Sequence, residues 1–514
     1  MHLSDHDLKQ IDREYLSKLT PEQLLKLSEK VIDDLRVARD RLNQNASNSS
    51  RPPSSQAPWE EVGNREEEAK RVEGRGETED GGEPTSTSSK QAEKATGRQK
   101  STESQGKPGK QAGAKGSGRR LEMRVTGEVW HKAEECRGCG KRFEAEARFA
   151  ATAGKYVLDV EKRDGGLEVT HVKHIYGKRV CSCGHETQTM PMSCPAEEGW
   201  QVALTEEHLV GPMLCSLLIC LSMRMRLSRR RIQELLADWL SISLSTGCIH
   251  QCITEGGRAM APLEEELIAA VQQSGLVFAD ETGWKENGHL VWLWVLRTAT
   301  ATLYLIGRRS WDVIADVMEH FAGWLMSDGY GQYRNYGKRL RCLAHLIRKA
   351  RGLEESCQPD AAAFGEKVLQ ILSQLIKGIY AARSDPDLEL RTHFSSELEQ
   401  LKELCEQHRH HSHQKTQQLA REFLNDWEAI WAVLDHPHLP ITNNEAERAL
   451  RHWVISRKLS NGTRNPQGSR AFTLLASVID TCRQRDVSPW PYIADVIAAR
   501  RTGNTPPPLP LPLT

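Results

Sequence analysis

Three short apolar runs in the middle of the chain constrain its fold most. They are LVFAD (276–280), LVWLWVLRTA (290–299) and TLYLIG (302–307), and each is typical of a β-strand. A helical pattern follows over 310–323, and another apolar run then leads into WLMSDGYGQY (324–333). Strands followed by a helix, one more strand and then further helices predict an α/β fold with a mixed sheet.

The region before residue 120 divides into two parts of different composition. Residues 8 to about 43 show a helical pattern with an apolar heptad repeat, formed by Leu25, Ile32, Leu35 and Leu42. This helix could form a short coiled coil or pack on its own chain. From residue 44 to about 119 there are almost no large apolar residues, so ordering this segment would cost entropy that no core offsets. We expect a disordered linker there.

Charge and cysteine usage limit the classes of protein that fit this chain. Lysine and arginine total 69, as do aspartate and glutamate, so only local basic patches could attract nucleic acid. The first residues, MHLSDHDLKQIDREYL, lack an apolar segment, and the most apolar stretch (212–225) is too short to span a bilayer. We therefore expect a soluble cytoplasmic protein, in which clustered cysteines indicate metal rather than disulfides.

Two cysteine pairs suggest a metal site between residues 121 and 200. CRGCG contains Cys136 and Cys139, and CSCGH contains Cys181, Cys183 and His185. Paired thiolates from two such turns suit a structural zinc ion. Because Cys-x-Cys is a short loop that strains one ligand, His185 or His174 could replace Cys181 or Cys183. Buried cysteines without a metal are the alternative.

Three acidic residues lie at or near the ends of predicted strands and helices. Asp280 ends the first strand, Asp328 follows a short strand and precedes a glycine, and Glu447 lies on a helix that begins near Asn443 or Asn444. Each has a plain structural interpretation as well, since Asp-Gly is a common turn and Asn444 with Glu447 fits a capping box. Three converging carboxylates could instead hold Mg²⁺ ions that cleave a phosphodiester. That chemistry requires the late helix to return to the sheet.

Five motifs in a fixed order give the chain a resemblance to a known family. They are ADETGW, SDGYGQY, CLAHLIRKA, NNEAERALR and GSRAFTLLASVIDTCRQRDVSPWPYIADVI. This order resembles transposases of the insertion sequence 66 family from about residue 120 to 500. The resemblance implies a ribonuclease-H-like core in which Asp280, Asp328 and Glu447 bind Mg²⁺ or Mn²⁺. It also implies a zinc-finger-like region at the cysteines, from whose usual Cys-x-x-Cys pattern the second pair departs.

With this resemblance the chain divides into eight parts. We expect an N-terminal helix with a coiled coil as one option (1–43), a disordered linker (44–120), a zinc-finger-like domain (121–200), a helical DNA-binding region (201–273), a first part of the catalytic core (274–354), a helical insertion (355–435), a second part of the core with C-terminal helices (436–500) and a Pro-rich tail (501–514).

A helix-turn-helix is expected within 201–273. Apolar residues recur at helical spacing at Ile232, Leu235, Leu236 and Trp239, and Ser245 is a suitable N-cap for a second helix. A plain helical hairpin has the same pattern, and the resemblance favours DNA binding. Candidate phosphate contacts are Arg229, Arg230 and Arg231 on the first helix, and Arg448 and Arg451 after Glu447; a solvated helix face is the alternative for each.

Four further features receive a structural interpretation. Glu281 should point to the opposite face of the strand from Asp280, and Glu445 is about 200° round the helix from Glu447. Cys342 and His345 match the family motif, but two soft ligands alone do not close a zinc site. The histidine-rich run HRHHSH (408–413) is interpreted as a solvated helical face rather than a metal site.

The resemblance predicts an enzyme that hydrolyses phosphodiesters at the ends of a mobile element and joins the freed 3′-OH to target DNA. Its partners would be the terminal inverted repeats, target DNA and further copies of itself, in the bacterial cytoplasm and on the nucleoid when DNA-bound. Accessory proteins of the same element remain an open question. The alternatives are an inactive DNA-binding protein derived from a transposase and an assembly protein that uses its coiled coil and Pro-rich tail.

Overall fold

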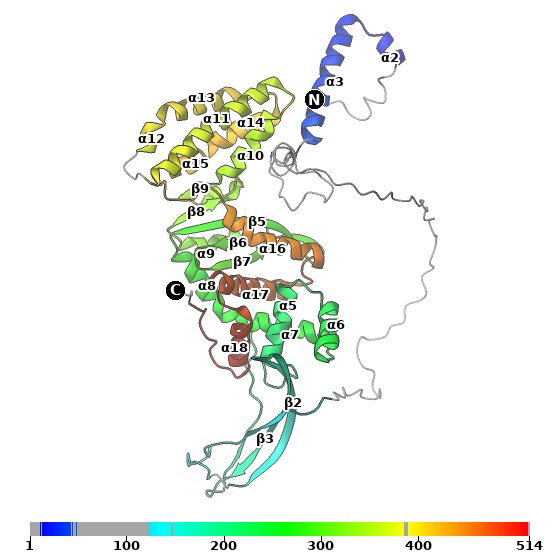
Figure 1. Cartoon of the computed structure of the whole chain (residues 1–514), viewed down its shortest axis with the longest axis vertical. Coiled ribbons are helices and arrows are strands. Elements are labelled where there is room, and N and C mark those ends of the chain that lie inside the picture. The colour runs from blue at the N-terminus through cyan, green and yellow to red at the C-terminus, as the bar shows by residue number, and fades with distance from the viewer. Residues whose placement is uncertain are drawn as a thin grey trace, which may run out of the picture. The chain divides into compact units, whose positions relative to one another are not determined.

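The computed structural model describes residues 11, 13–42, 44, 48, 123–144, 147–384 and 389–511. The linker predicted over 44–120 lies outside these residues, except at Gln44 and Asn48. The described elements form a mixed α/β structure with two sheets and several groups of helices (Figure 1). The mixed α/β class predicted from the sequence is therefore confirmed.

A five-stranded sheet contains all three predicted central strands. It consists of β5 (Leu276–Glu286), β6 (His289–Arg297), β7 (Thr302–Gly307), β8 (Trp324–Ser327) and β9 (Arg339–Arg341), in the order β7–β6–β5–β8–β9. The β5–β6 and β6–β7 pairs are antiparallel, whereas β5–β8 and β8–β9 are parallel. Strand β5 is thus central, with a hairpin partner on one side and a crossover partner on the other.

Two late helices return to this sheet. Helix α16 (Asn444–Ser460) packs on β5 and β6, and α17 (Pro466–Gln484) packs on β7 (Figure 1). The hydroxyl of Tyr304 on β7 donates to the backbone carbonyl of Ala449, 3.1 Å away, and to the carboxylate of Asp480 at 2.8 Å. Helix α16 is therefore fixed to the sheet, as a site containing Glu447 would require.

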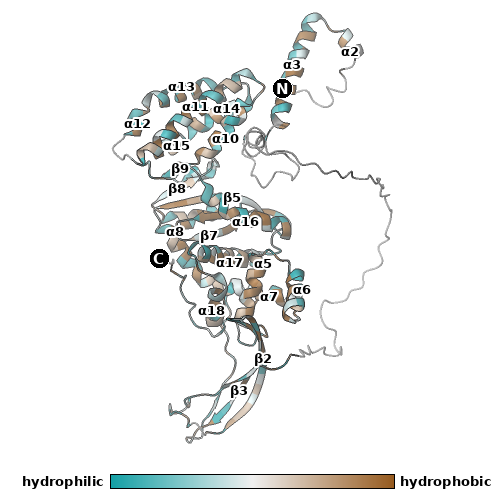
Figure 2. Ribbon diagram, viewed as in Figure 1, coloured by the Kyte–Doolittle hydropathy of each residue, from teal (hydrophilic) through white to brown (hydrophobic). Residues whose placement is uncertain are grey.

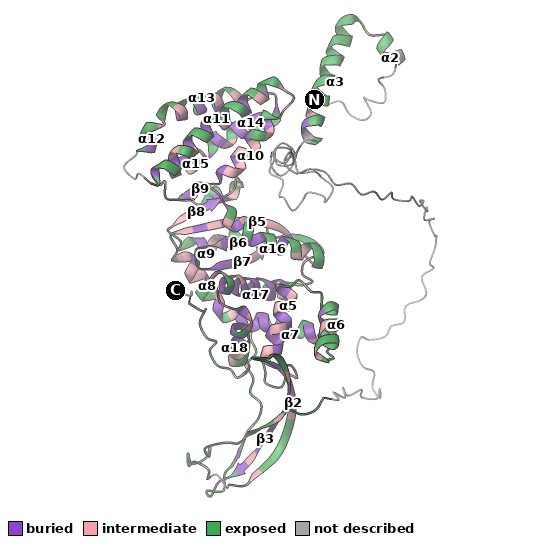
Figure 3. Cartoon of the chain, viewed as in Figure 1, coloured by how far each residue is buried: buried purple, intermediate pink, exposed green. Residues whose placement is uncertain are grey.

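The helical pattern expected over 355–435 is present between β9 and α16. The helices are α10 (Leu343–Glu354), α11 (Pro359–Ala382), α12 (Leu390–His393), α13 (Ser395–His408), α14 (Gln414–Asn425) and α15 (Trp427–Asp435). Their apolar sides share one core, which includes Phe364, Leu372, Phe423 and Trp431, and Figure 3 shows those sides buried. The run 408–413 is not a helical face, because α13 ends at His408 and His413 is buried against Thr416.

A second sheet lies in the region of the cysteine pairs. It consists of β1 (Gly127–His131), β2 (Phe149–Arg163), β3 (Gly166–Val180) and β4 (Glu186–Gln188). The two long strands β2 and β3 form an antiparallel hairpin, β1 pairs with β3 in parallel and β4 pairs with the end of β3. Cys181 and Cys183 therefore lie in the turn between β3 and β4, while Cys136 and Cys139 follow β1.

Four helices cover the stretch from 212 to 272. They are α5 (Pro212–Met223), α6 (Arg229–Leu240), α7 (Thr246–Met260) and α8 (Glu264–Gln272). Helices α5, α7, α17 and α18 (Pro489–Arg501) pack together, and Figure 2 shows hydrophobic colouring along α5, α7 and α17. The Ser245 hydroxyl accepts from the Cys248 amide at 3.2 Å, so the predicted N-cap is confirmed. Trp239 is 82% exposed, so its assignment to the apolar face of α6 was wrong, since only Ile232 and Leu236 are buried there.

The two ends of the described chain differ from simple expectation. The helix predicted over 8–43 is divided into α2 (Arg13–Ser17) and α3 (Pro21–Leu42), because Thr20 and Gln23 form a reciprocal cap at the start of α3. The Pro-rich tail packs on the protein as far as it is described, with Leu509 buried and its amide donating to Glu266. No described helix is long and apolar enough to cross a membrane.

Candidate active site and metal centre

Asp280 lies inside β5, which continues to Glu286, so it does not end the strand as expected, and Asp328 directly follows β8. In the register of the two parallel strands Phe278 pairs with Met326, and each aspartate comes two residues later in the chain. The two aspartates are therefore neighbours across the β5–β8 pair. Their proximity is also electrostatic, since the charge of Asp328 contributes to a raised pKa at Asp280.

Glu447 lies in the first turn of α16, which Asn443 attaches to the sheet. The Asn443 side-chain amide donates to the backbone carbonyl of Ala279 at 2.8 Å, directly before Asp280. Asn443 is the N-cap residue but caps no helix amide with its side chain, and Asn444 is the first helical residue. The capping box expected for Asn444 and Glu447 is therefore wrong. The helix start is held by a tertiary hydrogen bond, and the Glu447 carboxylate is not used for capping.

Like charges surround Asp280. Its pKa is raised well above the usual value, first by burial and then by the negative charges of Asp328, Glu281 and Glu447. A group of carboxyls that raise one another's pKa values is short of positive charge. Asp280, Asp328 and Glu447 each keep some exposure to solvent. Hard oxygen donors of this kind, from separate elements and open to solvent, suit a magnesium-class cation.

Glu281 belongs to the same electrostatic environment, although we expected it to point away. Its carboxylate accepts from Arg309 at 2.8 Å and from the buried Tyr333 hydroxyl at 2.7 Å. Burial and the charge of Asp328 raise the pKa of Glu281 to about 7 despite these partners. The Arg309 guanidinium is itself stacked between the rings of Trp292 and Tyr330, at 4.2 and 4.1 Å from their centroids. Only the adjacency of Glu281 to Asp280 signalled this in the sequence.

Helices α10–α15, which lie between β9 and α16, are called the inserted helices below. Ion pairs with these helices hold the segment that follows Asp328. Asp426, which is buried between α14 and α15, accepts from Arg334 and Arg339 at 2.9 Å each and pairs with Arg341. Burial alone would raise the pKa of Asp426, but the hydrogen bonds and charges of these arginines lower it. Arg341 also pairs with Glu422, which packs on Gly329. The inserted helices thus support one side of the acidic cluster.

Glu447 also faces two donors at the start of α10. One atom from each of Cys342, His345 and Glu447 lies within 4.8 Å of the others, and His345 Nε2 is 3.7 Å from the Glu447 carboxylate. Burial and the positive charges of Arg348, Lys349 and Arg341 lower the pKa of His345 to about 3, so its imidazole is neutral. Arg348 reaches Glu447 at 3.4 Å. Glu445 turns away from this group and pairs with Arg297 and Arg448.

The four predicted cysteines converge and could hold a zinc ion. Sγ of Cys136 lies 3.7 Å from that of Cys183, and Sγ of Cys139 lies 3.6 Å from that of Cys181. A tetrahedron with zinc–sulfur bonds of about 2.3 Å has sulfur–sulfur edges of about 3.8 Å, so the spacing fits. Burial alone would raise the pKa of Cys136, but hydrogen bonds from the Cys139 and Gly138 amides and the neighbouring thiols lower it to about 6.

Neither histidine considered as a substitute ligand takes a thiol's place in this cluster. His174 lies elsewhere on β3, with its Nδ1 2.9 Å from Nε2 of His131. His185 packs on Gly138, and the group of ligand atoms within 4.8 Å of one another contains only the four cysteines. Within the described ranges, this cluster and the Cys342 group are the two groups with metal-ligand geometry. The histidine-rich run 408–413 is not among them.

The predicted phosphate contacts lie on exposed surfaces. Arg229, Arg230 and Arg231 are exposed in the first turn of α6, where the Ser228 hydroxyl caps the Arg231 amide. Burial of the Arg229 guanidinium and then the charge of Arg464, in the loop after α16, lower the pKa of Arg229. Arg451 is exposed, whereas Arg448 is exposed but paired with Glu445 at 3.0 Å. The start of α6 and the loop after α16 thus form one basic surface.

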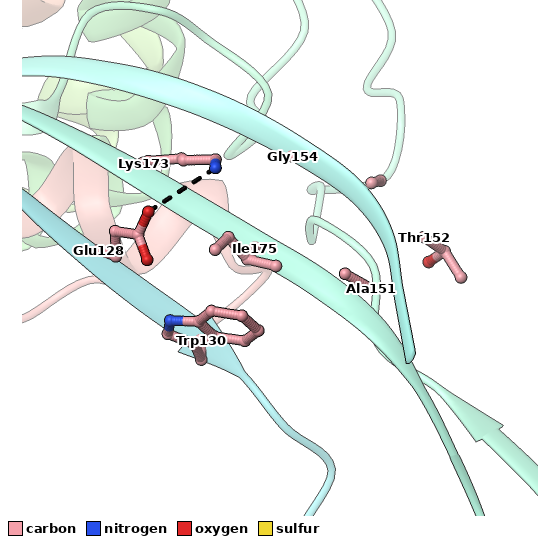
Figure 4. Close-up of a pocket in the computed structure, with 8 residues that line it drawn as sticks. Glu128, Trp130, Ala151, Thr152, Gly154, Lys173 and Ile175 are labelled. Atoms are coloured by element: carbon pink, nitrogen blue, oxygen red, sulfur yellow. Dashed lines mark ion pairs between the residues drawn. The ribbon is translucent and has the colours of Figure 1, made fainter. Parts of the chain in front are cut away.

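An open pocket on the second sheet offers much less chemistry. It is lined by residues of β1, β2 and β3, and its charged groups are Glu128 and Lys173, which pair with each other at 3.7 Å (Figure 4). Trp130 and Ile175 form its apolar floor beside the small residues of β2. The charged groups of this pocket are thus already paired with each other.

Comparison with known proteins shows the family of the chain. The sequence profile of the Transposase IS66 family matches residues 207–471, just over half of the chain. The chain belongs to this family. The matched IS66 segment includes Asp280, Asp328 and Glu447, together with the inserted helices. Family membership supports a transposase-related function that involves DNA.

Relatives of this IS66-family chain occur in Sinorhizobium fredii (strain NBRC 101917 / NGR234). The uncharacterized protein y4qI is 26% identical over 288 residues, covering 50% of this chain and 53% of y4qI. The uncharacterized protein y4jD is 26% identical over 282 residues, covering 48% of this chain and 54% of y4jD. This chain therefore spans about half the length of these two relatives.

Proposed function

We propose that this IS66-family chain is a metal-dependent DNA transposase. The observation that most supports the proposal is that carboxylates from three separate elements act on one another, since the charges of Asp328 and Glu447 add to the effect of burial in raising the pKa of Asp280. Asp280 on β5 and Asp328 directly after β8 follow paired positions of parallel strands, and Asn443 attaches the helix of Glu447 beside Asp280. A mixed five-stranded sheet with an acid on its central strand supports a ribonuclease-H-like core, in which the inserted helices interrupt the segment between Asp328 and Glu447.

The three carboxylates would hold Mg²⁺ or Mn²⁺, which supplies an activated water and stabilises the leaving oxygen when bound. The residues of the chain position the DNA phosphate between these groups. Water attacks the scissile phosphorus, the P–O3′ bond breaks, and the element's 3′-OH is released. In a second step that 3′-OH attacks a target phosphodiester, a new P–O bond forms, and a target 3′-oxygen leaves. Glu281, whose pKa is about 7, is suited to exchange a proton near the site at neutral pH.

The DNA would contact exposed arginines of α6 and α16. Arg229, Arg230 and Arg231 at the start of α6, and Arg451 on α16, can bind phosphates without base specificity. Helices α6 and α7 would then act as a helix-turn-helix for the ends of the element, and zinc would hold the four-cysteine turns of the second sheet. We further propose that the chain acts as a homo-oligomer on terminal inverted repeats and target DNA.

Single substitutions of the three acids test the proposal. Asp280→Asn, Asp328→Asn and Glu447→Gln should each abolish cleavage and strand transfer with Mg²⁺, on DNA that carries the inverted repeats flanking the gene. The matched control is Glu445→Gln, whose carboxylate pairs with Arg297 and Arg448 and should matter far less. Full activity in any of the three variants would remove that residue from the site. DNA binding without cleavage under any divalent metal would instead indicate an inactive DNA-binding protein.

A further inference from the structure

The start of helix α10 presents two soft metal ligands beside an acid that the catalytic proposal also uses. Cys342 is the N-cap of α10 and His345 follows within its first turn, so both side chains face the same side. Glu447 comes from the first turn of α16, about a hundred residues later, and completes a set of one sulfur, one nitrogen and one oxygen donor within 4.8 Å. The sequence pattern alone lacked this third ligand.

The surroundings of Cys342 suit a thiolate bound to a cation. The thiol is fully buried and its sulfur accepts a hydrogen bond from the Asn443 amide at 3.2 Å. Amide donors to a ligand sulfur are typical outer contacts of metal–thiolate sites. His345 Nε2 lies 3.7 Å from the Glu447 carboxylate, so this nitrogen is the one placed to bind an ion between them.

The geometry is close to that of zinc sites with three protein ligands. Donor atoms around tetrahedral zinc are roughly 3.3–3.8 Å apart. The 3.7 Å between His345 Nε2 and the Glu447 carboxylate already matches this spacing, and no pair of the three donor atoms is more than 4.8 Å apart. The side chain of Glu447 is 33% exposed and that of His345 is 17% exposed, which leaves a route for the ion and a fourth position for water. A thiolate and a carboxylate together balance the charge of one divalent ion, and Arg348 remains beside the site.

We propose that Cys342, His345 and Glu447 form a second metal site, selective for zinc-class ions, which competes with the acidic cluster for Glu447. Binding releases the thiol proton of Cys342 to solvent and forms bonds from the metal to sulfur, nitrogen and oxygen. A zinc ion held there turns the Glu447 carboxylate towards α10 and away from Asp280. The competition with catalysis rests on the proposed function, whereas the binding of zinc does not.

Zinc content tests the site directly. The full-length protein is equilibrated with Zn²⁺, separated from excess metal, and its zinc per chain is measured by elemental mass spectrometry. The wild type should hold about two ions, one at the four cysteines and one here, while Cys342→Ser and His345→Asn should hold about one. The weakening of the second site should be about 100-fold or more. The matched control, Cys405→Ser, changes a buried cysteine of the inserted core outside both clusters and should hold about two.

Cobalt provides a second measurement that needs no variant to fold. Titration of the wild type with Co²⁺ should give a second binding step whose thiolate-to-cobalt absorption corresponds to one sulfur. The proposal is overturned if the wild type binds only one ion, or if Cys342→Ser keeps both. In strand-transfer assays with Mg²⁺, added Zn²⁺ should inhibit the wild type more strongly than His345→Asn, relative to each protein's own rate. A chain with no strand transfer but two zinc ions would refute the catalytic proposal and leave the zinc site intact.

Discussion

The acidic cluster and the four-cysteine cluster each bring together side chains from separate elements, but different contacts hold them there. The cysteines come from the turns that follow the parallel neighbours β1 and β3, and their sulfurs can hydrogen-bond to one another, so the Sγ atoms approach to 3.6–3.7 Å. The acids repel one another, and this repulsion adds to burial in raising the pKa of Asp280. Two turns at adjacent strand ends build the first site, whereas the second also depends on the return of α16 to the sheet.

Breaking the cysteine cluster should have the largest effect. Cys136→Ser should remove zinc, whose binding free energy of about 10 kcal/mol or more is also folding free energy for a small metal-bound domain. Limited proteolysis should then cut within 127–188 while the five-stranded sheet stays resistant. Cys194→Ser is the control, because that thiol lies outside the cluster and donates a hydrogen bond to Glu197. Unchanged zinc content in Cys136→Ser would show that the sulfurs do not bind metal.

Removing the Asp426 ion pairs between the sheet and the inserted helices should have the second-largest effect on stability. Asp426→Asn leaves Arg334, Arg339 and Arg341 without their shared carboxylate, so it should cost about 3–5 kcal/mol in the free energy of unfolding. Urea denaturation measures the loss. Asp435→Asn breaks an exposed pair with Arg391 and should cost about 1 kcal/mol or less. Equal losses in the two variants would contradict a special role for the buried network.

The pH dependence of stability should distinguish the acidic cluster from an ordinary surface. The pKa of Glu281 is about 7 in the folded protein against 4.5 for the free side chain, so the folded state holds its proton longer. In Mg²⁺-free buffer without chelator, stability should therefore fall by about 3 kcal/mol as pH rises from 4.5 to about 7. Glu281→Gln should flatten this slope in urea titrations, and a slope identical to that of the wild type would disprove the assignment.

Adding a methyl group at Gly329, in the loop after Asp328, should have the smallest effect on stability. A Cβ atom on Gly329 would lie 2.5 Å from the Glu422 carboxylate and 2.8 Å from the Arg341 guanidinium. We therefore expect Gly329→Ala to lower stability by about 1–3 kcal/mol, measured by thermal unfolding. Gly337→Ala is the matched control, because a Cβ there would meet nothing within 4 Å. If both variants unfold like the wild type, the loop is not tightly supported by the inserted helices.

The sequence was informative where residues close together determine the structure. The apolar runs predicted β5, β6 and β7, and Ser245 caps α7 as expected, because both signals are local. Strand β9 was missed because its three residues, RLR, have no apolar alternation. Trp239 fits a helical apolar pattern and yet is 82% exposed, because none of the described elements covers it.

Long-range contacts account for what the sequence did not show at the site. Asn444 and Glu447 have the spacing of a capping box, but Asn443 bonds to Ala279 instead and sets the start of the helix. The nearness of Glu447 to Cys342 and His345 depends on the return of α16 to α10. The raised pKa of Glu281 depends on burial and on Asp328, which comes from the segment after β8. Residue patterns could suggest the three acids as a set but not these neighbours.

The amide of Leu343 donates to the carbonyl of Ile441 at 2.9 Å, so the chain leaves the sheet region and re-enters it at one point. The inserted helices therefore form an insertion whose two ends are hydrogen-bonded neighbours. The entropy of closing such an insertion changes only logarithmically with its length, so roughly doubling it would cost about 0.6 kcal/mol. Evolution can therefore lengthen, shorten or replace these helices while the distance between Asp328 and Glu447 stays fixed, which makes this junction a natural place to graft new domains onto the same acidic site.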